Sequence, residues 1–317
     1  MISCTEFIPM YSEFFKFLDK RGGGYDAVLE YWYHISDTSL GDETNPHSMV
    51  SFIKKYGGFD GAMKYWGHTT TEEACDSYGV RDDEQRYSYG HMRYCPSRGM
   101  LNSLKHIEPY ENYCEHCKII YSRVLEKYGC VYERDHSKVW NAECESVLYE
   151  AGNPPPADYK EPKEGRIVSD VKREGMKYLH RDFHLLGDNA LRYCADKFGE
   201  DAVVEFMKDY TEAFYSPQIA EFKKEGLSAL KTWIEKIYEV EEASEVLHCE
   251  LEEDRLTVTI DYCPVIKYMR ELNQQPSPYY IEETRTHYAT IAEASGFGFE
   301  LEYYNEDGGT KFIFTKA

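Results

Sequence analysis

The spacing of hydrophobic residues along the chain changes between a helical period and an alternating one. Positions three and four residues apart predict helices, and glycine runs at 22–24 and 57–58 separate them. Alternating positions predict strands. The first part of the chain is therefore expected to contain helices at 7–20, 26–36, 47–56 and 59–77, a strand at 86–94, two helices between Cys95 and Gly129, and hairpin strands at 130–140 and 144–150.

The second part of the chain predicts nearly the same order of elements. A run at 151–165 with four prolines and few large apolar residues separates the two parts and is interpreted as a linker. Beyond it we expect a helical stretch at 167–195 that breaks near Gly187, helices at 200–215, 217–225 and 227–242, strands at 245–251 and 255–262, two helices after Cys263, and a final hairpin at 297–304 and 310–316.

The two parts also share residues at a constant offset. Upstream, GYDAVLEYW echoes GEDAVVEFM. Such a pattern predicts a tandem duplication of a unit of roughly 145 residues. The expected domains are a first, Cys-rich repeat at 1–150, the linker at 151–165 and a second repeat at 166–317. At an offset of 167, Tyr113, Glu115, Lys118 and Tyr121 correspond to Tyr280, Glu282, Arg285 and Tyr288.

Each repeat combines N-terminal helices, an antiparallel sheet and two helices between strands. Helices packed at one side of an antiparallel sheet are typical of the α+β class, which is the predicted fold class. Two such repeats could be arranged about a pseudo-twofold axis, as the protomers of a dimer are.

Charge and composition limit the partners that the chain is expected to have. A formal net charge of -21 argues against a nucleic-acid partner, because phosphate binding needs clustered Lys and Arg. The chain has no apolar run as long as a membrane span, and its start does not resemble a signal peptide, so we expect a cytoplasmic protein without a membrane partner. The 29 tyrosines are typical of a pocket lined by rings and hydroxyls, which indicates a small-molecule substrate or ligand. Assembly into a homo-oligomer is left open.

Ten cysteines in a chain expected in the cytoplasm are interpreted as thiols, metal ligands or catalytic groups before disulfides. Cys114 and Cys117 have the two-residue gap that lets two thiolates hold one ion, and Cys95 lies in the neighbouring element. With Cys130 or His116 as a fourth ligand, they would form a tetrahedral zinc site. The alternative is that these small, soft side chains only pack in a core.

The segment His180-Arg-Asp-Phe-His184 occurs only in the second repeat. Histidines four residues apart lie on one face of a helix and can share an ion or a substrate. Arg181 adds an anion-binding group, and Asp182 adds a general base or a group that orients a histidine. The alternative is a solvated helix face on which the histidines have no role.

Cys263 follows a predicted strand and begins a helix, where unpaired amide groups and the helix dipole lower a thiol pKa. Cys95 occupies the same place in the first repeat. Both cysteines could be nucleophiles, or both could fill the corner between strand and helix.

Several longer motifs of the chain can be compared with a known family. YSYGHMRYCP, YCEHC and CVYERDHSKVWNAECESVLYE give the order Cys-Pro, two helices and a closing hairpin. This order resembles the L-2-amino-thiazoline-4-carboxylate hydrolase family, and LHRDFH and IDYCPVIKYM are similar to uncharacterised members of the same group. Ile281 stands where family members usually have Cys. The Cys and Glu pattern is more distantly similar to vinyl-reductase-like sensor domains, which bind zinc and small aromatic effectors.

The resemblance implies addition of water to a cyclic C=N carbon and opening of a small heterocycle that carries a carboxylate. This chemistry needs a base for water, a proton donor for the departing nitrogen and a cation for the carboxylate. Under this hypothesis the catalytic residues are His180 or His184 as base, Asp182 as orienter, Glu282 as acid and Cys263, and the substrate-binding residues are Arg181, Arg285, Tyr279, Tyr280, His287 and Tyr288.

Two other interpretations compete with the hydrolase. In one, the tandem repeats form a small-molecule sensor with a structural zinc at Cys95, Cys114 and Cys117. In the other, the first repeat is structural and only the second has a pocket. We expect the working pocket in or beside the second repeat, because the shared fold does not require the segment from His180 to His184.

Overall fold

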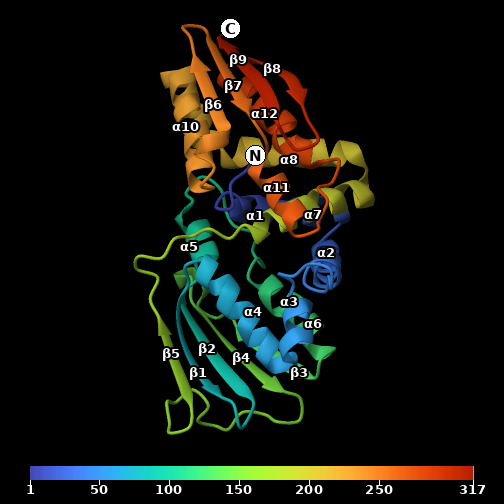
Figure 1. Ribbon diagram of the computed structural model, residues 1–317, viewed down its shortest axis with the longest axis vertical. Coiled ribbons are helices and arrows are strands. Elements are labelled where there is room, and N and C mark those ends of the chain that lie inside the picture. Colours follow the sequence, from blue (N-terminus) through green and yellow to red (C-terminus); the bar gives the residue numbers. More distant parts are fainter. Residues whose placement is uncertain (317) are drawn as a thin grey trace. The chain divides into compact units, whose positions relative to one another are not determined.

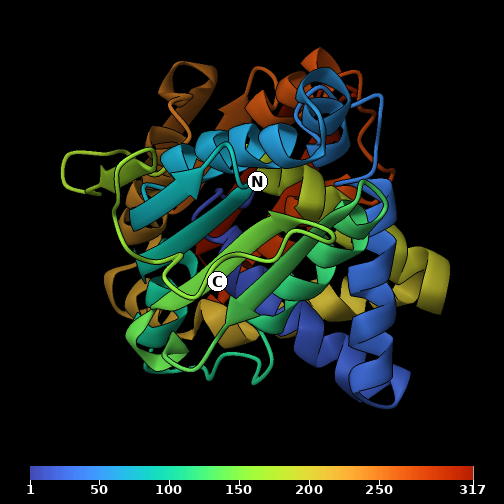
Figure 2. The same cartoon turned by 90° about the horizontal axis from the view of Figure 1, so that it is seen from below.

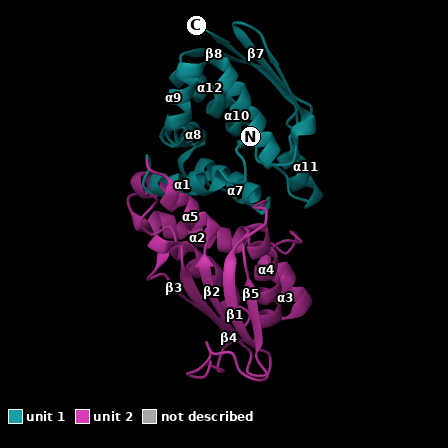
Figure 3. Ribbon diagram, turned by 90° about the vertical axis from the view of Figure 1, so that its left-hand side faces the viewer, with its two compact units in different colours: residues 1–17, 106–108, 181–317 teal, residues 18–105, 109–180 magenta. Residues whose placement is uncertain are grey.

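The computed structural model describes residues 1–316 and shows an α+β fold, which confirms the predicted class (Figure 1). The described residues form helices α1 to α12 and two antiparallel sheets, one of five strands and one of four. The chain divides into two compact units, coloured separately in Figure 3. Unit 1 contains Met1–Phe17, His106–Glu108 and Arg181–Ala317, and unit 2 contains Leu18–Lys105 and Pro109–His180.

Unit 2 carries most of the first repeat. Its elements are α2 (Tyr25–Thr38), α3 (Met49–Tyr56), α4 (Gly58–Glu72), β1 (Asp76–Asp82), β2 (Tyr87–Tyr94), α5 (Pro96–Ser103), α6 (Glu115–Glu126), β3 (Cys130–Asp135), β4 (Cys144–Glu150) and β5 (Ile167–Val171). Helix α1 (Phe7–Gly22) begins in unit 1, and its residues from Leu18 onward belong to unit 2. The strand order is β3-β4-β2-β1-β5. Helix α3 packs on α4, α2 packs on α6, and α6 packs on β3.

Unit 1 carries most of the second repeat. Its elements are α7 (Asp182–Phe198), α8 (Glu200–Phe214), α9 (Ser216–Glu225), α10 (Leu227–Val240), β6 (Leu247–Leu251), β7 (Arg255–Ile260), α11 (Pro264–Glu271), η3 (Tyr280–Glu283), α12 (Arg285–Ser295), β8 (Phe297–Tyr304) and β9 (Thr310–Lys316). The strand order is β6-β7-β9-β8. Helix α9 packs on α10, α8 packs on α12, and α12 packs on β8.

The two units have the same order of elements and the same strand order, except that β5 is added to the sheet of unit 2. Cys95 and Cys263 are the N-caps of α5 and α11, and the proline after each takes the first helical turn, where its fixed φ fits. Gly129 and Gly296, with φ of 71° and 80°, take the left-handed conformation just before β3 and β8. The common origin of the repeats remains a prediction that this agreement supports.

Two of the predicted elements are wrong. The helix expected at 59–77 ends at Glu72, and β1 follows it. The helix expected at 167–195 is in fact strand β5, a loop and helix α7, because Ile167–Val171 pairs with β1 to complete the sheet of unit 2. Pairing with a distant strand overrode the local helical pattern in this segment. The two compact units divide at His180 and Arg181, beyond the Pro-rich linker.

None of the helices formed by residues 1–316 is long and apolar enough to cross a membrane.

Candidate functional site

Unit 2 contains a cavity of about 380 Å³ between helix α4 and one face of its sheet. Figure 1 and Figure 2 show α4 lying along the strands of that sheet. Trp66 and Met63 line the cavity from the helix side, and all five strands contribute to the floor and walls. A volume of this size is typical of a site for a small molecule.

The floor of the cavity is a row of residues that crosses the sheet, and all of them are small except the arginine at one end. Backbone pairing places Arg134, Ser146, Gly90, Gly79 and Ser169 side by side on the five strands. Directly paired residues share one face of a sheet, so this row lies on one side. A Cβ atom built at Gly90 would lie 3.1 Å from Ser146 Oγ, and one built at Gly79 would lie 2.9 Å from Ser169 Oγ, which places both hydroxyls beside the bare backbone.

The matching row of unit 1 is made of larger, apolar residues. Gly90 and Val258 stand at the same distance in the chain before the capping residues Cys95 and Cys263. Val258 pairs with Phe312, and Phe312 pairs with Leu301, where unit 2 has Ser146 and Arg134. Val258 and Phe312 are fully buried and pack in the core with residues of α10. The space that is open in unit 2 is thus filled in unit 1.

Arg134 provides a guanidinium at one end of this floor. Its Nη1 donates to Tyr132 Oη at 3.0 Å, and its Nη2 donates to the thiol of Cys144 at 2.9 Å. Its Nε is buried and has no hydrogen-bond partner. No carboxylate of residues 1–316 forms an ion pair with it. Burial opposes the charge, but Tyr132, Cys117 and Cys144 keep the pKa of Arg134 well above its usual value.

The residues that line this cavity include no Asp or Glu, although the chain has a formal net charge of -21. The second arginine of the lining, Arg81, is already paired with Asp60 at 2.6 Å and with Asp83. Burial raises the pKa of the carboxyl of the nearby Glu73, and the charges of His180 and Arg134 offset only part of this shift. The cavity therefore favours an anion.

The three predicted zinc ligands all lie in unit 2, but they do not form a tetrahedral group. The charge of Cys117 acts on both Cys95 and Cys114. However, the ligand atoms of these residues do not all lie within 4.8 Å of one another, as ligands about 2.3 Å from one ion would. The residues have the right chemistry, but their geometry here does not fit the ion, so zinc stays an untested expectation.

Cys117 has a different environment from its neighbour Cys114. His116 Nε2 lies 3.4 Å from Cys117 Sγ, and His116 Nδ1 faces the carbonyl of Tyr113. Burial raises the pKa of Cys117, but His116 and Arg134 more than offset this and lower it to about 7. Burial raises the pKa of Cys114 to about 12. The first turn of α6 thus holds one thiol that is ionised near neutral pH and one that is not.

The histidines of the segment 180–184 do not share a helix face, and that prediction is wrong because α7 begins only at Asp182. His180 belongs to unit 2, where its Nδ1 lies 2.6 Å from Glu72 Oε2. His184 belongs to unit 1 and lies 3.1 Å from Glu241 Oε2. Both rings are buried and paired, so the alternative of two solvated histidines is also wrong.

The polar neighbours of these histidines have structural partners as well. Arg181 donates from Nη2 to the backbone carbonyl of Glu241 at 2.9 Å. Asp182 accepts a hydrogen bond from Tyr268 at 2.5 Å. These contacts place the two residues at packing positions within unit 1.

Among the remaining predicted residues, the structure brings Cys263, Tyr280 and Tyr288 together in the apolar core of unit 1. Cys263 Sγ lies 3.9 Å from Tyr280 Oη, and burial raises the pKa of both groups. This environment opposes a nucleophilic thiolate at Cys263.

Of the other members of the predicted site, His287 contacts this group, with its ring centroid 5.1 Å from that of Tyr288. Glu282 accepts hydrogen bonds from Arg285 and Thr286. Tyr279 is half-buried and donates to Glu200 at 3.3 Å. His287 is fully buried, its Nδ1 lies 2.9 Å from Thr211 Oγ1, and burial lowers its pKa well below the usual value.

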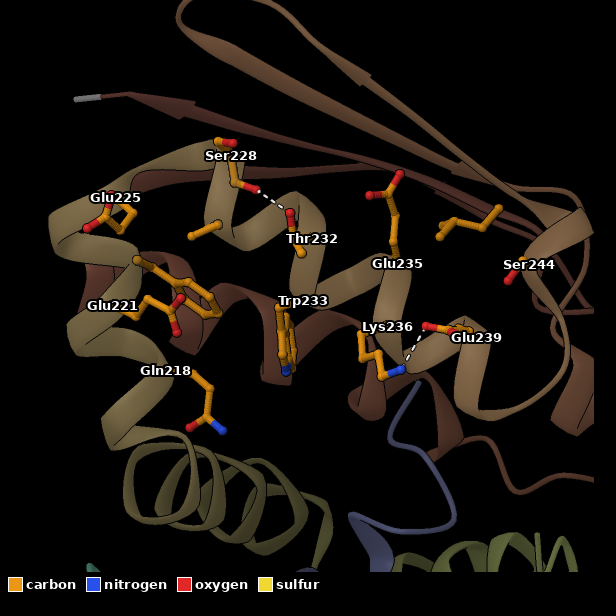
Figure 4. Close-up of a pocket in the computed structure, with 13 residues that line it drawn as sticks. Gln218, Glu221, Glu225, Ser228, Thr232, Trp233, Glu235, Lys236, Glu239 and Ser244 are labelled. Carbon is orange, nitrogen blue, oxygen red and sulfur yellow. Dashed lines mark hydrogen bonds and ion pairs between the residues drawn. The ribbon is translucent and has the colours of Figure 1, made fainter. Parts of the chain in front are cut away.

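Unit 1 has a second, more open cavity of about 850 Å³, which is a groove along α9, α10 and the start of β6 (Figure 4). Trp233 and Leu247 give it apolar contact area, and several glutamates line its rim. Two of these carboxylates are paired with lysines, Glu235 with Lys231 at 2.6 Å and Glu239 with Lys236 at 2.8 Å. None of the residues predicted for the site lines this groove or the cavity of unit 2.

Sequence patterns did not predict the residues that form the cavity of unit 2, chiefly Gly79, Gly90, Arg134, Cys144 and Ser146. A signal was present: aligned on their Cys-Pro pairs, YGHMRYCP and TVTIDYCP differ by glycine against valine in the middle of a strand. Glycine in a strand interior marks a place where another group approaches the backbone.

No protein-family model, no curated protein and no solved structure matches this chain.

Proposed function

We propose that the chain is a tandem-duplicated, small-molecule-binding protein whose ligand site is the cavity of unit 2. The observation that carries this proposal is the contrast between the two sheets. The row that is Gly90 and Ser146 in unit 2 is Val258 and Phe312 in unit 1, and only the first leaves open space. Filling such a space with apolar side chains would stabilise the fold by roughly 1.5–3 kcal/mol per residue. A site for a ligand explains why unit 2 lacks this stabilisation.

The resemblances to the thiazoline-carboxylate hydrolase family and to the sensor domains give this proposal two forms, an enzyme and a binding module. The binding module is favoured, because the side chains on the cavity face include no carboxylate or imidazole that could activate water. His91 contributes to the lining, but it belongs to the row paired with Tyr78 and Glu145, which alternation places on the opposite face.

The test transplants the side chains of unit 1 into unit 2. In ligand-observed NMR, we expect the unaltered protein to bind small ring compounds and the double variant Gly90→Val, Ser146→Phe to lose this binding. Its thermal unfolding and circular dichroism report whether it folds. The matched control, Ser228→Phe, adds the same ring to the groove of unit 1 at an exposed position and should leave binding intact. Unchanged binding by the folded double variant would refute the proposal.

Hydrolysis of a cyclic C=N bond is the second candidate, and one observation favours it. The half-buried Cys117 and His116 form a thiol and imidazole pair in the same unit as the cavity. The roles considered for His180, His184 and Glu282 remain hypotheses, and each of these residues has a partner in the structure. Incubation with 2-amino-thiazoline-4-carboxylate and measurement of the loss of its ring absorbance would decide. Turnover that Gly90→Val, Ser146→Phe abolishes would establish the enzyme.

A further inference from the structure

The cavity of unit 2 has a charge and a shape that together narrow the class of its ligand. We propose that it binds a planar organic monoanion, with the acidic group on Arg134 and the ring on the floor formed by Gly79 and Gly90. This inference rests on the proposed function, because it takes the cavity to be the ligand site. Arg134 takes the place of Arg181 and Arg285 as the residue expected to bind a carboxylate.

The negative charge is assigned to the ligand because no Asp or Glu lines the cavity, and Cys117, the thiol with a lowered pKa that acts on Arg134, is already paired with His116. Two of the five N–H groups of Arg134 are used, one by Tyr132 and one by Cys144. The Nε–H is buried and unused. A buried donor on a cation without an acceptor is destabilising, and a carboxylate that accepts from two nitrogens of a guanidinium would remove that cost.

The planar shape of the ligand is inferred from the floor of the cavity. Gly79 and Gly90 are paired neighbours on β1 and β2, so the centre of the sheet there is bare backbone without Cβ atoms. Ser146 and Ser169 flank this backbone with hydroxyls. Trp66 faces the floor from α4 and packs at 4.8 Å on Tyr132, the residue that holds Arg134. We therefore place a flat ring between this backbone and the indole, with its acidic group at the end where Arg134 lies.

The ligand is expected to carry a single negative charge because the second arginine of the lining, Arg81, is already paired. Arg81 is neutralised by Asp60 and Asp83, whereas Arg134 has only uncharged or weakly acidic partners. One uncompensated cation calls for one negative charge. Ligands with two acidic groups would place the second against a position that is already paired.

Three probes separate charge from shape: benzoate has both, benzyl alcohol has the ring without the charge, and acetate has the charge without the ring. Calorimetric titration should show that benzoate binds at least about tenfold more tightly than either of the others. Arg134→Met should lower the affinity for benzoate by at least about tenfold and leave benzyl alcohol unchanged. The matched control is Arg123→Met, which removes an arginine of unit 2 that is paired with Asp37 at 2.7 Å and does not line the cavity. It should change the benzoate affinity by less than about twofold.

A second variant keeps the test decisive if Arg134→Met does not fold. Ser146→Asp places a carboxylate next to Arg134 in the same row, so it should raise the unfolding temperature and abolish benzoate binding. Equal affinities for benzoate and benzyl alcohol, or wild-type benzoate binding by a folded Arg134→Met or Ser146→Asp protein, would overturn the anion assignment and leave the ligand cavity standing. Benzoate binding that persists in Gly90→Val, Ser146→Phe would overturn the proposed function as well.

Discussion

The sheets of unit 1 and unit 2 share the order of four strands but differ in the side chains of their central row. In unit 1 the central row is Val258, Phe312 and Leu301, and α10 packs on it with leucine and isoleucine. In unit 2 the same row is Gly90, Ser146 and Arg134, and a cavity of about 380 Å³ separates it from α4. One fold can therefore serve as a packed core or as a binding site, depending on a few side chains in one row.

Phe312→Ala should give the largest effect, because it removes a fully buried ring from the packed row of unit 1. We expect the free energy of unfolding to fall by about 3–5 kcal/mol, as measured by urea denaturation. Ser146→Ala is the matched change in unit 2 and should cost well under about 1 kcal/mol, since its side chain borders open space. Equal losses from the two variants would contradict the contrast between the sheets.

Glu241→Gln should have the next largest effect, and it should depend on pH. Burial raises the pKa of Glu241, but the charge of His184 and the amide of Cys4 more than offset it and lower the pKa to about 2. Because the folded pKa lies below the unfolded one, this carboxylate stabilises unit 1 above about pH 4.5, and the contribution is lost as the pH falls towards 2. Its full size is about 3 kcal/mol.

Urea titrations between pH 2 and pH 7 check this prediction. The unaltered protein should lose stability steeply as the pH falls below 4.5, and Glu241→Gln should be less stable at pH 7 with a flatter acid limb. A variant whose pH profile parallels that of the unaltered protein would show that Glu241 is not the responsible group.

Glu73→Gln should give the smallest effect, and its pH dependence should be opposite to that of Glu241→Gln. Burial raises the pKa of Glu73, and only part of the shift is offset by His180 and by the hydroxyl of Ser97. A folded pKa above the unfolded one stabilises unit 2 below about pH 4.5, and this contribution is lost as the pH rises. Hydrogen-exchange protection of unit 2 amides should therefore fall less between pH 4 and pH 7 in Glu73→Gln than in the unaltered protein. A larger fall in the variant would refute this reasoning.

Much of the fold could be predicted because the relevant signals are local. The prolines after Cys95 and Cys263 mark the starts of α5 and α11, and both hairpins were expected close to where they occur. Strand β5 was missed, because Ile167–Val171 is exposed and its strand conformation comes from pairing with β1. The site was predicted on polar residues of the second repeat, yet His184 and Glu282 each have a partner that the local sequence does not reveal.

Residues close together in the chain are enough to predict the α+β class, the order of the elements apart from β1 and β5, and the corners at which α5 and α11 begin. Which residues share a surface depends instead on how distant segments of the chain pair in the folded protein. Gly90, Ser146 and Arg134 come from three strands and meet through backbone pairing across the sheet. The lack of a carboxylate beside Arg134 is likewise a property of the folded neighbourhood, since Glu133 and Asp135 flank it in the chain and alternation points them to the other face.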